Sequence, residues 1–252
     1  MSELKPQVYK DPRPAEHFTR FHTRARRGIG WTYHWVRILL TGPTMLIFRA
    51  RGLDTENVPE HGPLIITPNH FSQMDHFFTG IFMRRRVQFM AKSQLFTNPI
   101  FTYIFTHGGV FPVRRGHDDQ EAFITAHTVL NRGGCVLMYA EGGRSRSGKL
   151  GEPKRGVGKL ALESGVPVVP VAIHGSASVR RWKRLRFPKV TVQFGEPVRF
   201  DKVDDPTREQ EQEAAQRVFD SVRRMYQELE DKGRAGVLRD RRRQTPADSY
   251  SS

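Results

Sequence analysis

Residues 63–75 read Pro-Leu-Ile-Ile-Thr-Pro-Asn-His-Phe-Ser-Gln-Met-Asp, and this stretch decides the fold. Its first part, Leu64–Thr67, is a short apolar run with β-branched side chains, which predicts a buried strand. Beyond the stretch, apolar side chains recur at helical spacing from Phe77 to Phe82. His70 therefore lies where a strand ends and a helix begins, and ligand sites form at that edge of an open α/β sheet.

The pair of His70 and Asp75 is the first candidate for chemistry. A neutral imidazole can accept a proton from a bound hydroxyl, and a nearby carboxylate can fix its tautomer. In one regular helix, five residues turn the chain by about 500°, so the two side chains would not share a face. They can meet only if His70 lies outside the helix and the chain curls back. The spacing also fits a turn histidine followed by a first-turn acid that the helix dipole favours.

From residue 64 to residue 194, runs that predict strands alternate with runs that predict helices. This alternation predicts an α/β fold whose sheet is largely parallel or mixed and is flanked by helices. The predicted strands are 64–67, 87–90, 109–113, 135–139, 168–173 and 190–194. The predicted helices are 77–82, 100–105, one opened by Asp118 and closed by Gly133, 154–164, and a long one opened by Thr207 and Gln210 and closed by Gly233.

The chain divides into four predicted segments. A flexible N-terminus covers 1–16, and an N-terminal helical membrane-associating motif covers 17–52. The α/β domain covers 53–233, and a disordered basic tail covers 234–252.

The segment Trp31–Phe48 carries aromatic and aliphatic side chains between flanking arginines. Gly42-Pro43 is expected to break it into two helices. Such an apolar face serves either as an interfacial membrane anchor or as the packing face of an ordinary helical hairpin, and both interpretations stay open.

Composition narrows the classes of partner. The 252 residues carry a formal net charge of +15, which attracts nucleic acid, an anionic membrane face or phosphorylated substrates. Cys135 is the single cysteine, so no intrachain disulfide framework is expected. The polar N-terminus lacks the apolar region of a signal peptide, and no uninterrupted run of 18 apolar residues predicts a spanning helix.

Two arginine-bearing loops follow predicted strands and should reach the same sheet edge as His70. Arg114 and Arg115 end the first strand, and the Gly-rich segment 141–149 follows the second. Guanidinium groups grip phosphate bidentately, and glycines let backbone N–H groups approach it. The alternative is that these are solvated surface arginines. The segment 143–149 lacks the Ser or Thr and the helix of a P-loop, and no metal-ligand spacing is found.

Taken together, these motifs resemble the glycerolipid acyltransferase family, the bacterial 1-acylglycerol-3-phosphate acyltransferases and their relatives. Four blocks match in the family's order between about residues 60 and 175. They are Asn69-His70 with Asp75, Gly109–Arg114, Glu141–Ser145 and the proline-containing strand Val166–Val171. Gly143 stands where Thr is common, and Pro112-Val113 replace a frequent apolar-Asp pair.

The resemblance implies transfer of an acyl chain from acyl-CoA or acyl carrier protein to a lysophospholipid hydroxyl, foremost 1-acylglycerol 3-phosphate giving phosphatidic acid. It makes His70 the general base and Asp75 the residue that orients it. It assigns the acceptor phosphate to Arg114, Glu141, Gly142, Gly143, Arg144 and Ser145, with Asn69, Arg115, Lys92 and Pro170 as secondary candidates. A thioester is already activated, so neither a metal nor a bound cofactor is expected.

The implied location is the cytoplasmic face of the cell membrane, as a peripheral or monotopic protein beside anionic lipid. No nucleic-acid partner is expected. Three alternatives remain: the same chemistry on glycerol 3-phosphate, another lysophospholipid or a glycolipid; a non-catalytic module that binds anionic lipid; and a nucleic-acid-binding protein suggested by charge alone.

Overall fold

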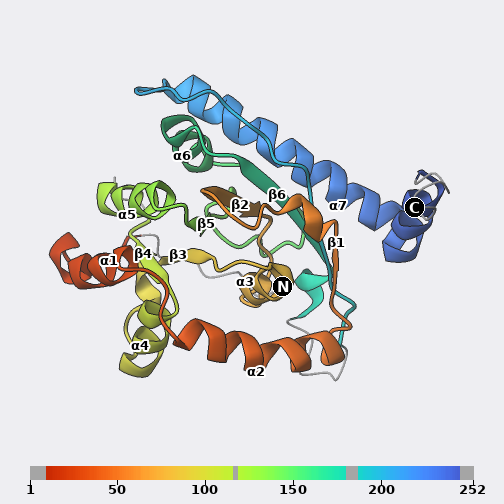
Figure 1. Ribbon diagram of the computed structural model, residues 1–252, viewed down its shortest axis with the longest axis horizontal. Coiled ribbons are helices and arrows are strands. Elements are labelled where there is room, and N and C mark those ends of the chain that lie inside the picture. The colour runs from red at the N-terminus through yellow and green to blue at the C-terminus, as the bar shows by residue number, and fades with distance from the viewer. Residues whose placement is uncertain (1–9, 116–118, 180–186, 245–252) are drawn as a thin grey trace.

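The computed structural model, shown in Figure 1, describes residues 10–115, 119–179 and 187–244. Its centre is a seven-stranded sheet in the order β1-β7-β6-β2-β5-β3-β4. Only β6 and β7 pair antiparallel, so the sheet is mixed, and this confirms the predicted fold class. The strands are β1 (Arg51–Leu53), β2 (Leu64–Pro68), β3 (Gln88–Lys92), β4 (Val110–Val113), β5 (Cys135–Leu137), β6 (Val168–His174) and β7 (Thr191–Phe194).

Helices cover both faces of this sheet. The helices are α1 (Thr19–Arg26), α2 (Thr32–Ile47), α3 (Asp75–Phe82), α4 (Pro99–His107), α5 (Gln120–Asn131), α6 (Gly156–Ser164) and α7 (Arg208–Gln244). Side chains of α5, α6 and α7 pack with Ile65, Val136 and Val168 on one face, and those of α2 and α3 pack with Leu64, Ile66 and Leu137 on the other. Figure 1 shows these layers, with α6 and α7 above the sheet and α2 and α3 below it. Alternate residues of β2 thus enter opposite cores, as the pleat requires.

Local sequence signals explain where several helices begin and end. The Asn98 side chain accepts N–H bonds from the first turn of α4, which has Pro99 at its first position. Thr207 and Gln210 form a reciprocal capping box before α7, as their spacing predicts. Gly165 ends α6 in the left-handed conformation. α5 is capped by Asp119, whereas the predicted cap, Asp118, lies outside the described residues.

The prediction that Gly42-Pro43 breaks the segment 31–48 is wrong, because α2 continues through Pro43. Pro43 cannot donate a hydrogen bond to the carbonyl of Leu39, four residues earlier in the helix. Leu39 is on the exposed side of α2, so the lost bond does not disturb the packed face of the helix. The actual break lies earlier, where Gly28 has a φ of 112° between α1 and α2. The N-terminal segment thus does contain two helices, but they are α1 and α2.

Both predicted flexible ends are more ordered than expected within the described residues. Asp11 is buried and pairs with Arg13, whose guanidinium also donates to backbone carbonyls of Ser93 and Phe96. The prediction of a flexible 1–16 is therefore wrong for 10–16, and residues 1–9 lie outside the described part.

At the other end, the helix does not stop at Gly233. That glycine makes a kink, with φ 62° and ψ 169°, and helix resumes to Gln244. Val237 is fully buried and Arg241 pairs with Asp54, so this last helical piece packs beside β1. The prediction of a disordered 234–252 is wrong for 234–244, because a buried apolar residue and ion pairs hold it; 245–252 lie outside the described residues.

Candidate active site

His70 and Asp75 meet because the chain between them turns back on itself. α3 begins at Asp75, so His70 lies before the helix, in the loop that follows β2. His70 Nδ1 is 2.9 Å from Asp75 Oδ2, and the backbone N–H groups of Phe71 and Ser72 donate to the same oxygen at 2.7 Å. The curled loop that the spacing required is present, and three donors on one carboxylate oxygen hold it.

This geometry leaves one nitrogen of His70 available as a base. Because Asp75 Oδ2 accepts from its neighbours, Nδ1 is the donor and Nε2 carries the lone pair. The imidazole stacks on the Tyr139 ring at a centroid distance of 3.8 Å. Burial lowers the pKa of His70, although the Asp75 carboxylate acts in the opposite direction. A neutral ring that can accept a proton near pH 7 follows from this balance.

Two buried polar side chains fix the backbone around His70. Asn69 accepts the N–H of Ile173 at 2.7 Å and donates to its carbonyl at 3.1 Å, which ties the end of β2 to β6. Glu141 accepts the backbone N–H of His70 at 2.9 Å with one oxygen and that of Gly151 at 2.8 Å with the other. Both carboxylate oxygens of Glu141 are thus occupied by the frame of the site.

The structure thus places Glu141 where it holds the His70 loop, whereas the resemblance assigns this residue to the acceptor phosphate. A carboxylate would also repel a phosphate. Pro170 is buried within β6 and pairs in register with Thr67, so it shapes the frame rather than the cavity wall.

His70 lies on the wall of a cavity of about 820 Å³. A volume of this size is typical of small-molecule sites. Apolar side chains form most of the wall away from His70, and they come from α2, α3, α4, β3 and the short turn that follows β3. They include Val36, Leu40, Phe77, Ile81, Phe89, Leu95, Phe101, Ile104 and Phe105. The cavity therefore joins a proton acceptor to an apolar chamber.

Cationic side chains gather in the same cavity. Lys92 ends β3, Arg115 follows β4, and Arg144 and Arg146 lie in the loop after β5. These strands run parallel, so their carboxyl ends meet at one edge of the sheet. Burial lowers the pKa of Lys92, and the charges of Arg144, Arg115 and Arg146 lower it further. An anion bound among them would relieve this repulsion.

The structure does not bring Arg114 into this cavity. Its guanidinium donates to the Arg13 carbonyl at 3.0 Å, and its backbone N–H donates to Asp119 Oδ2. The neighbouring Arg115, a secondary candidate in the sequence, lines the cavity instead. Successive side chains at a strand end point to opposite faces of the sheet. Arg114 and Arg115 therefore point in opposite directions, and only Arg115 reaches the cavity.

The segment 142–145 contributes mainly one side chain to the wall, Arg144. Gly142 turns the chain with a φ of 65°, and Gly143 follows it. Ser145 donates its backbone N–H to the His70 carbonyl at 2.8 Å, and its hydroxyl donates to the Lys149 carbonyl. Gly142 and Ser145 therefore shape the loop that carries Arg144 to the site.

Sequence reasoning did not single out Tyr139 or Arg146. Tyr139 stacks on His70. Its sequence position could have indicated this, because Tyr139 ends a predicted strand and therefore lies at the same edge of the sheet as His70. Arg146 follows Arg144 at a spacing of two in a loop already noted for its basic charge. The contribution of α2 and α4 to the wall had no sequence signal, because it depends on tertiary packing.

Among the residues that the structure describes, no three His, Cys, Asp or Glu side chains are grouped so that they could hold a metal ion. None of the helices within 10–115, 119–179 and 187–244 is both long and apolar enough to cross a bilayer.

Comparisons agree with the fold and the motifs. The sequence model of the Acyltransferase family matches residues 51–174, from the start of β1 to the end of β6. The crystal structure of the 1-acyl-sn-glycerophosphate acyltransferase from Thermotoga maritima is similar, with a TM-score of 0.60 and 24% identity over 86% of this chain and 80% of that one. At this identity the likeness supports the fold alone.

Curated relatives match this chain over part of their length. A chloroplastic 1-acyl-sn-glycerol-3-phosphate acyltransferase from Arabidopsis thaliana is 29% identical over 127 residues, which are 49% of this chain and 35% of that protein. The enzyme of that name from Pseudomonas aeruginosa is 28% identical over 141 residues, 55% of this chain and 52% of that protein. The matched part thus spans about a third to a half of these relatives.

Residues 51–174, which contain His70 and Asp75, are thus an α/β domain that matches the Acyltransferase family model. The curated proteins to which this domain is similar include 1-acyl-sn-glycerol-3-phosphate acyltransferases.

Proposed function

We propose that the protein transfers a fatty acyl chain from a thioester, acyl-CoA or acyl-acyl carrier protein, to the hydroxyl of 1-acylglycerol 3-phosphate, giving phosphatidic acid. One observation carries the proposal: a neutral, Asp-oriented histidine lies where a cationic cluster meets an apolar cavity. A substrate with a phosphate, a hydroxyl and a fatty chain matches these three features. The names of the relatives agree with this substrate.

In the proposed reaction, His70 Nε2 takes the proton from the acceptor hydroxyl as its oxygen attacks the thioester carbonyl. The tetrahedral intermediate then collapses, the carbon–sulfur bond breaks, and the imidazolium returns the proton to the leaving thiolate. Asp75 holds the imidazole in the productive tautomer and stabilises its charged form. The products are the ester and the free thiol, so no nucleophile from the protein is required.

Substrate contacts follow from the cavity. We assign the acceptor phosphate to Arg115, Arg144 and Lys92, with Arg146 close by, because guanidinium and ammonium groups bind phosphate strongly. Burial of an acyl chain against Phe77, Phe101 and the other apolar side chains of the wall contributes about 0.8 kcal/mol per methylene.

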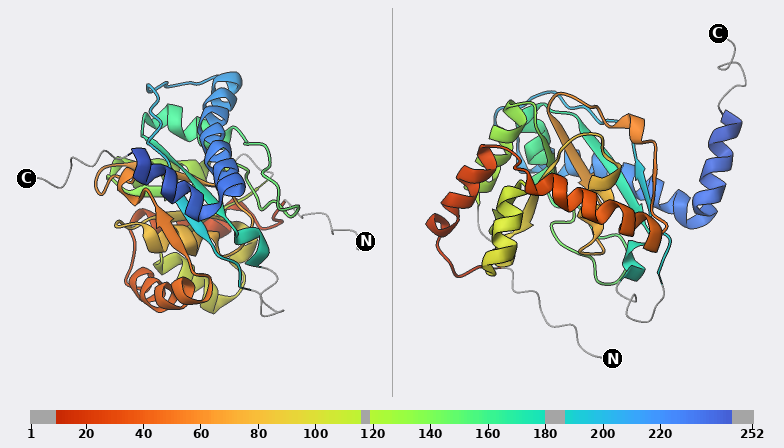
Figure 2. Two further views of the ribbon diagram at one scale, coloured as in Figure 1. Left: turned by 90° about the vertical axis from the view of Figure 1, so that its right-hand side faces the viewer. Right: turned by 60° about the horizontal axis from the view of Figure 1, so that its bottom comes forward.

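We further propose that α2 and α4 attach the protein to the cytoplasmic face of a membrane. Both lie at the bottom in Figure 1 and in the left panel of Figure 2. Each of the two helices contributes some side chains to the cavity wall and leaves other large apolar side chains exposed to solvent. The exposed set is Trp31, Trp35, Ile38, Leu39, Met45, Leu46 and Ile47 around α2, and Ile100, Phe101 and Tyr103 on α4. An interfacial helix pair fits this pattern, and the net charge of +15 favours anionic lipid.

The test is acyl transfer by the purified protein on liposomes, followed as release of free thiol. Palmitoyl-CoA and oleoyl-CoA, and then the corresponding acyl carrier protein thioesters, are offered with a panel of acceptors. We expect release that depends on 1-acylglycerol 3-phosphate. Release only with glycerol 3-phosphate, another lysophospholipid or a glycolipid would keep the chemistry and change the acceptor.

A non-catalytic lipid-binding module predicts vesicle binding with no thiol release from any donor. A nucleic-acid-binding protein predicts tight, steeply salt-dependent binding of DNA or RNA and indifference to His70→Ala. Either result would contradict the proposed function.

A further inference from the structure

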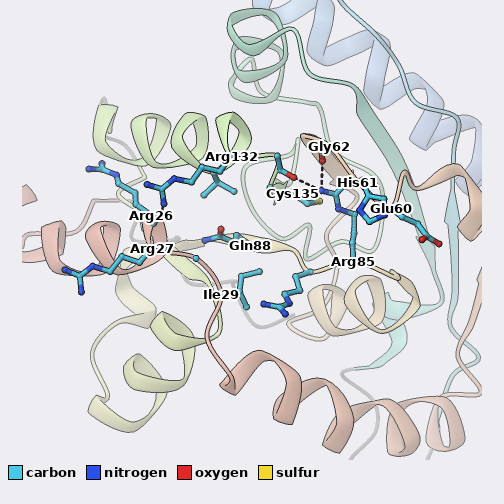
Figure 3. Close-up of a pocket in the computed structure, with 15 residues that line it drawn as sticks. Arg26, Arg27, Ile29, Glu60, His61, Gly62, Arg85, Gln88, Arg132 and Cys135 are labelled. Carbon is cyan, nitrogen blue, oxygen red and sulfur yellow. Dashed lines mark hydrogen bonds between the residues drawn. The ribbon is translucent and has the colours of Figure 1, made fainter.

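A second cationic pocket lies at the opposite edge of the sheet from His70. Its volume is about 340 Å³, and Figure 3 shows its lining. The segments that precede β2, β3 and β5 form it together with the end of α1. These three strands are parallel, and at their other ends His70 follows β2, Lys92 ends β3 and Tyr139 follows β5. A five-residue strand is about 17 Å long, so the two sites are separate.

Five arginines line this amino-edge pocket: Arg26, Arg27, Arg85, Arg86 and Arg132. Glu121 pairs with Arg26, and Glu60 is the one carboxylate among the described lining residues. Three helices, α1, α3 and α5, also end within three residues of a lining arginine, and each has about half a negative charge at its C-terminus. The five guanidinium groups together carry more charge than the two carboxylates and the three helix ends. Stabilisation of helix C-termini therefore does not explain why all five arginines gather here.

Arg85 is the rigid part of the pocket. Its guanidinium donates to the carbonyls of Pro59, Gly62 and Gly133, which joins the loops before β2 and β5. Figure 3 shows the bond to Gly62 across the pocket. Carbonyls are neutral partners, so the Arg85 charge is not compensated there. Gln88 is fixed in the same way, because its amide donates to the Ala25 carbonyl at 3.0 Å.

The exposed donors of the pocket are Arg86 and Arg132. In the described part of the chain, no carboxylate pairs with either guanidinium. Arg132 donates only to the Arg26 carbonyl, and both side chains are exposed at the pocket rim. Exposed guanidinium groups around a fixed cationic floor form a site for a compact dianion, because each can grip two of its oxygens.

We propose that the amino-edge pocket binds a phosphate monoester, at a site distinct from the proposed acceptor site. The pocket is concave and small, which suits one phosphate group with a few attached atoms rather than a nucleic-acid backbone. Ile29 also lines it and belongs to the linker into α2, so the phosphate has two sources: a lipid headgroup at the membrane or a soluble phosphate.

The test compares Arg86→Gln/Arg132→Gln with the matched control Arg20→Gln/Arg224→Gln. The control removes the same charge from exposed arginines outside the pocket. Flotation measures the preference for phosphatidylcholine vesicles containing phosphatidic acid over vesicles of equal surface charge containing phosphatidylglycerol. Calorimetry with inorganic phosphate measures the soluble arm. We expect a loss of at least about fivefold in one arm for the pocket variant alone, because the variant removes two guanidinium contacts to the phosphate.

A third variant reverses the sign. Glu60→Gln removes the lining carboxylate, so phosphate should bind more tightly than in the parent protein. Selective loss in the vesicle arm assigns a lipid headgroup, and selective loss in the calorimetric arm assigns a soluble phosphate. Equal behaviour of the pocket variant and the control in both arms, with melting temperatures unchanged, would overturn the proposal. Acyl transfer is not the readout, so failure of the proposed function would leave this result interpretable.

Discussion

The His70 imidazole is held from two directions, by the Asp75 carboxylate at Nδ1 and by the Tyr139 ring against its face. The sequence could predict the pairing with Asp75, because the spacing of five demanded a curled loop. It could not predict that Glu141 would accept the His70 N–H, since that bond joins residues 71 positions apart. The sequence also could not predict that Arg115 rather than Arg114 faces the cavity. That choice depends on how β4 is oriented in the sheet, which is set by contacts distant in the sequence.

The tautomer argument predicts the pH dependence of Asp75→Asn. The parent kcat/KM should fall as His70 becomes protonated, below its ordinary pKa of 6.5, because burial lowers the pKa. Asp75 raises the pKa of His70, so its neutralisation should move this acidic limb to lower pH. The plateau should fall by about 10²-fold or more, because the amide favours the wrong tautomer. A pH profile checks both effects, and an unchanged plateau would contradict the assigned orientation.

A pair of neighbouring variants tests the cationic end of the cavity. Arg115→Gln should raise the KM for the lysophospholipid by about 10- to 100-fold, the effect of one lost bond to a charged group. Arg114→Gln should leave this KM nearly unchanged and instead lower the melting temperature, since Arg114 binds the Arg13 carbonyl. Initial rates and thermal melts of both variants separate the two roles. The opposite ranking of KM values would place the acceptor phosphate at Arg114.

At the scale of elements, every strand except β1 was predictable from the sequence. Apolar runs such as Leu64–Thr67 and Val168–Ile173 predict buried strands, and the structure has buried strands there. β1 has three residues with only Leu53 buried, too few for a pattern. The helix after Gly233 is rich in arginine, so its composition resembled a disordered tail, and only its contacts with Asp54 and the core hold it.

α3 supplies a test of the apolar chamber. Gly80 lines the cavity, and a Cβ there would lie 3.7 Å from the Phe89 ring and 4.0 Å from the Tyr33 hydroxyl. Gly80→Leu should therefore shorten the chamber and move preference from palmitoyl toward shorter acyl donors. Gly42→Leu is the control, because nothing lies within 4 Å of that glycine. Competition between acyl-CoA chain lengths measures the shift, and an unchanged preference would exclude this cavity as the acyl site.

At the scale of the whole molecule, charge and apolar surface act together. The chain carries 41 Lys and Arg against 26 Asp and Glu. The exposed apolar side chains gather on α2 and α4, which are on one side in both figures. The cavity wall uses the same two helices. A lipid acceptor and its acyl chain would therefore enter from the surface that we propose lies on the membrane.

Membrane attachment through α2 is tested with Trp35→Ser/Ile38→Ser/Leu39→Ser, three side chains that are each more than half exposed. Burial of a large apolar side chain is worth about 1.5–3 kcal/mol, so flotation with anionic vesicles should fall at least tenfold. Ile124→Ser on α5 is the control, as it is also exposed. Salt should weaken binding of the parent protein as well. Equal flotation of both variants would mean that α2 packs only on its own domain.

The most direct test of the central claim is thiol release from acyl-CoA in the presence of 1-acylglycerol 3-phosphate, measured for the parent, His70→Ala and the surface control His61→Ala. With Asp75-oriented His70 as the base, His70→Ala should lose about 10²- to 10⁴-fold in acceptor-dependent rate, while its melting temperature and vesicle binding stay near those of the parent. His61→Ala should retain full activity, because His61 lies at the opposite edge of the sheet. Acceptor-dependent release by folded His70→Ala at the parental rate would contradict the account.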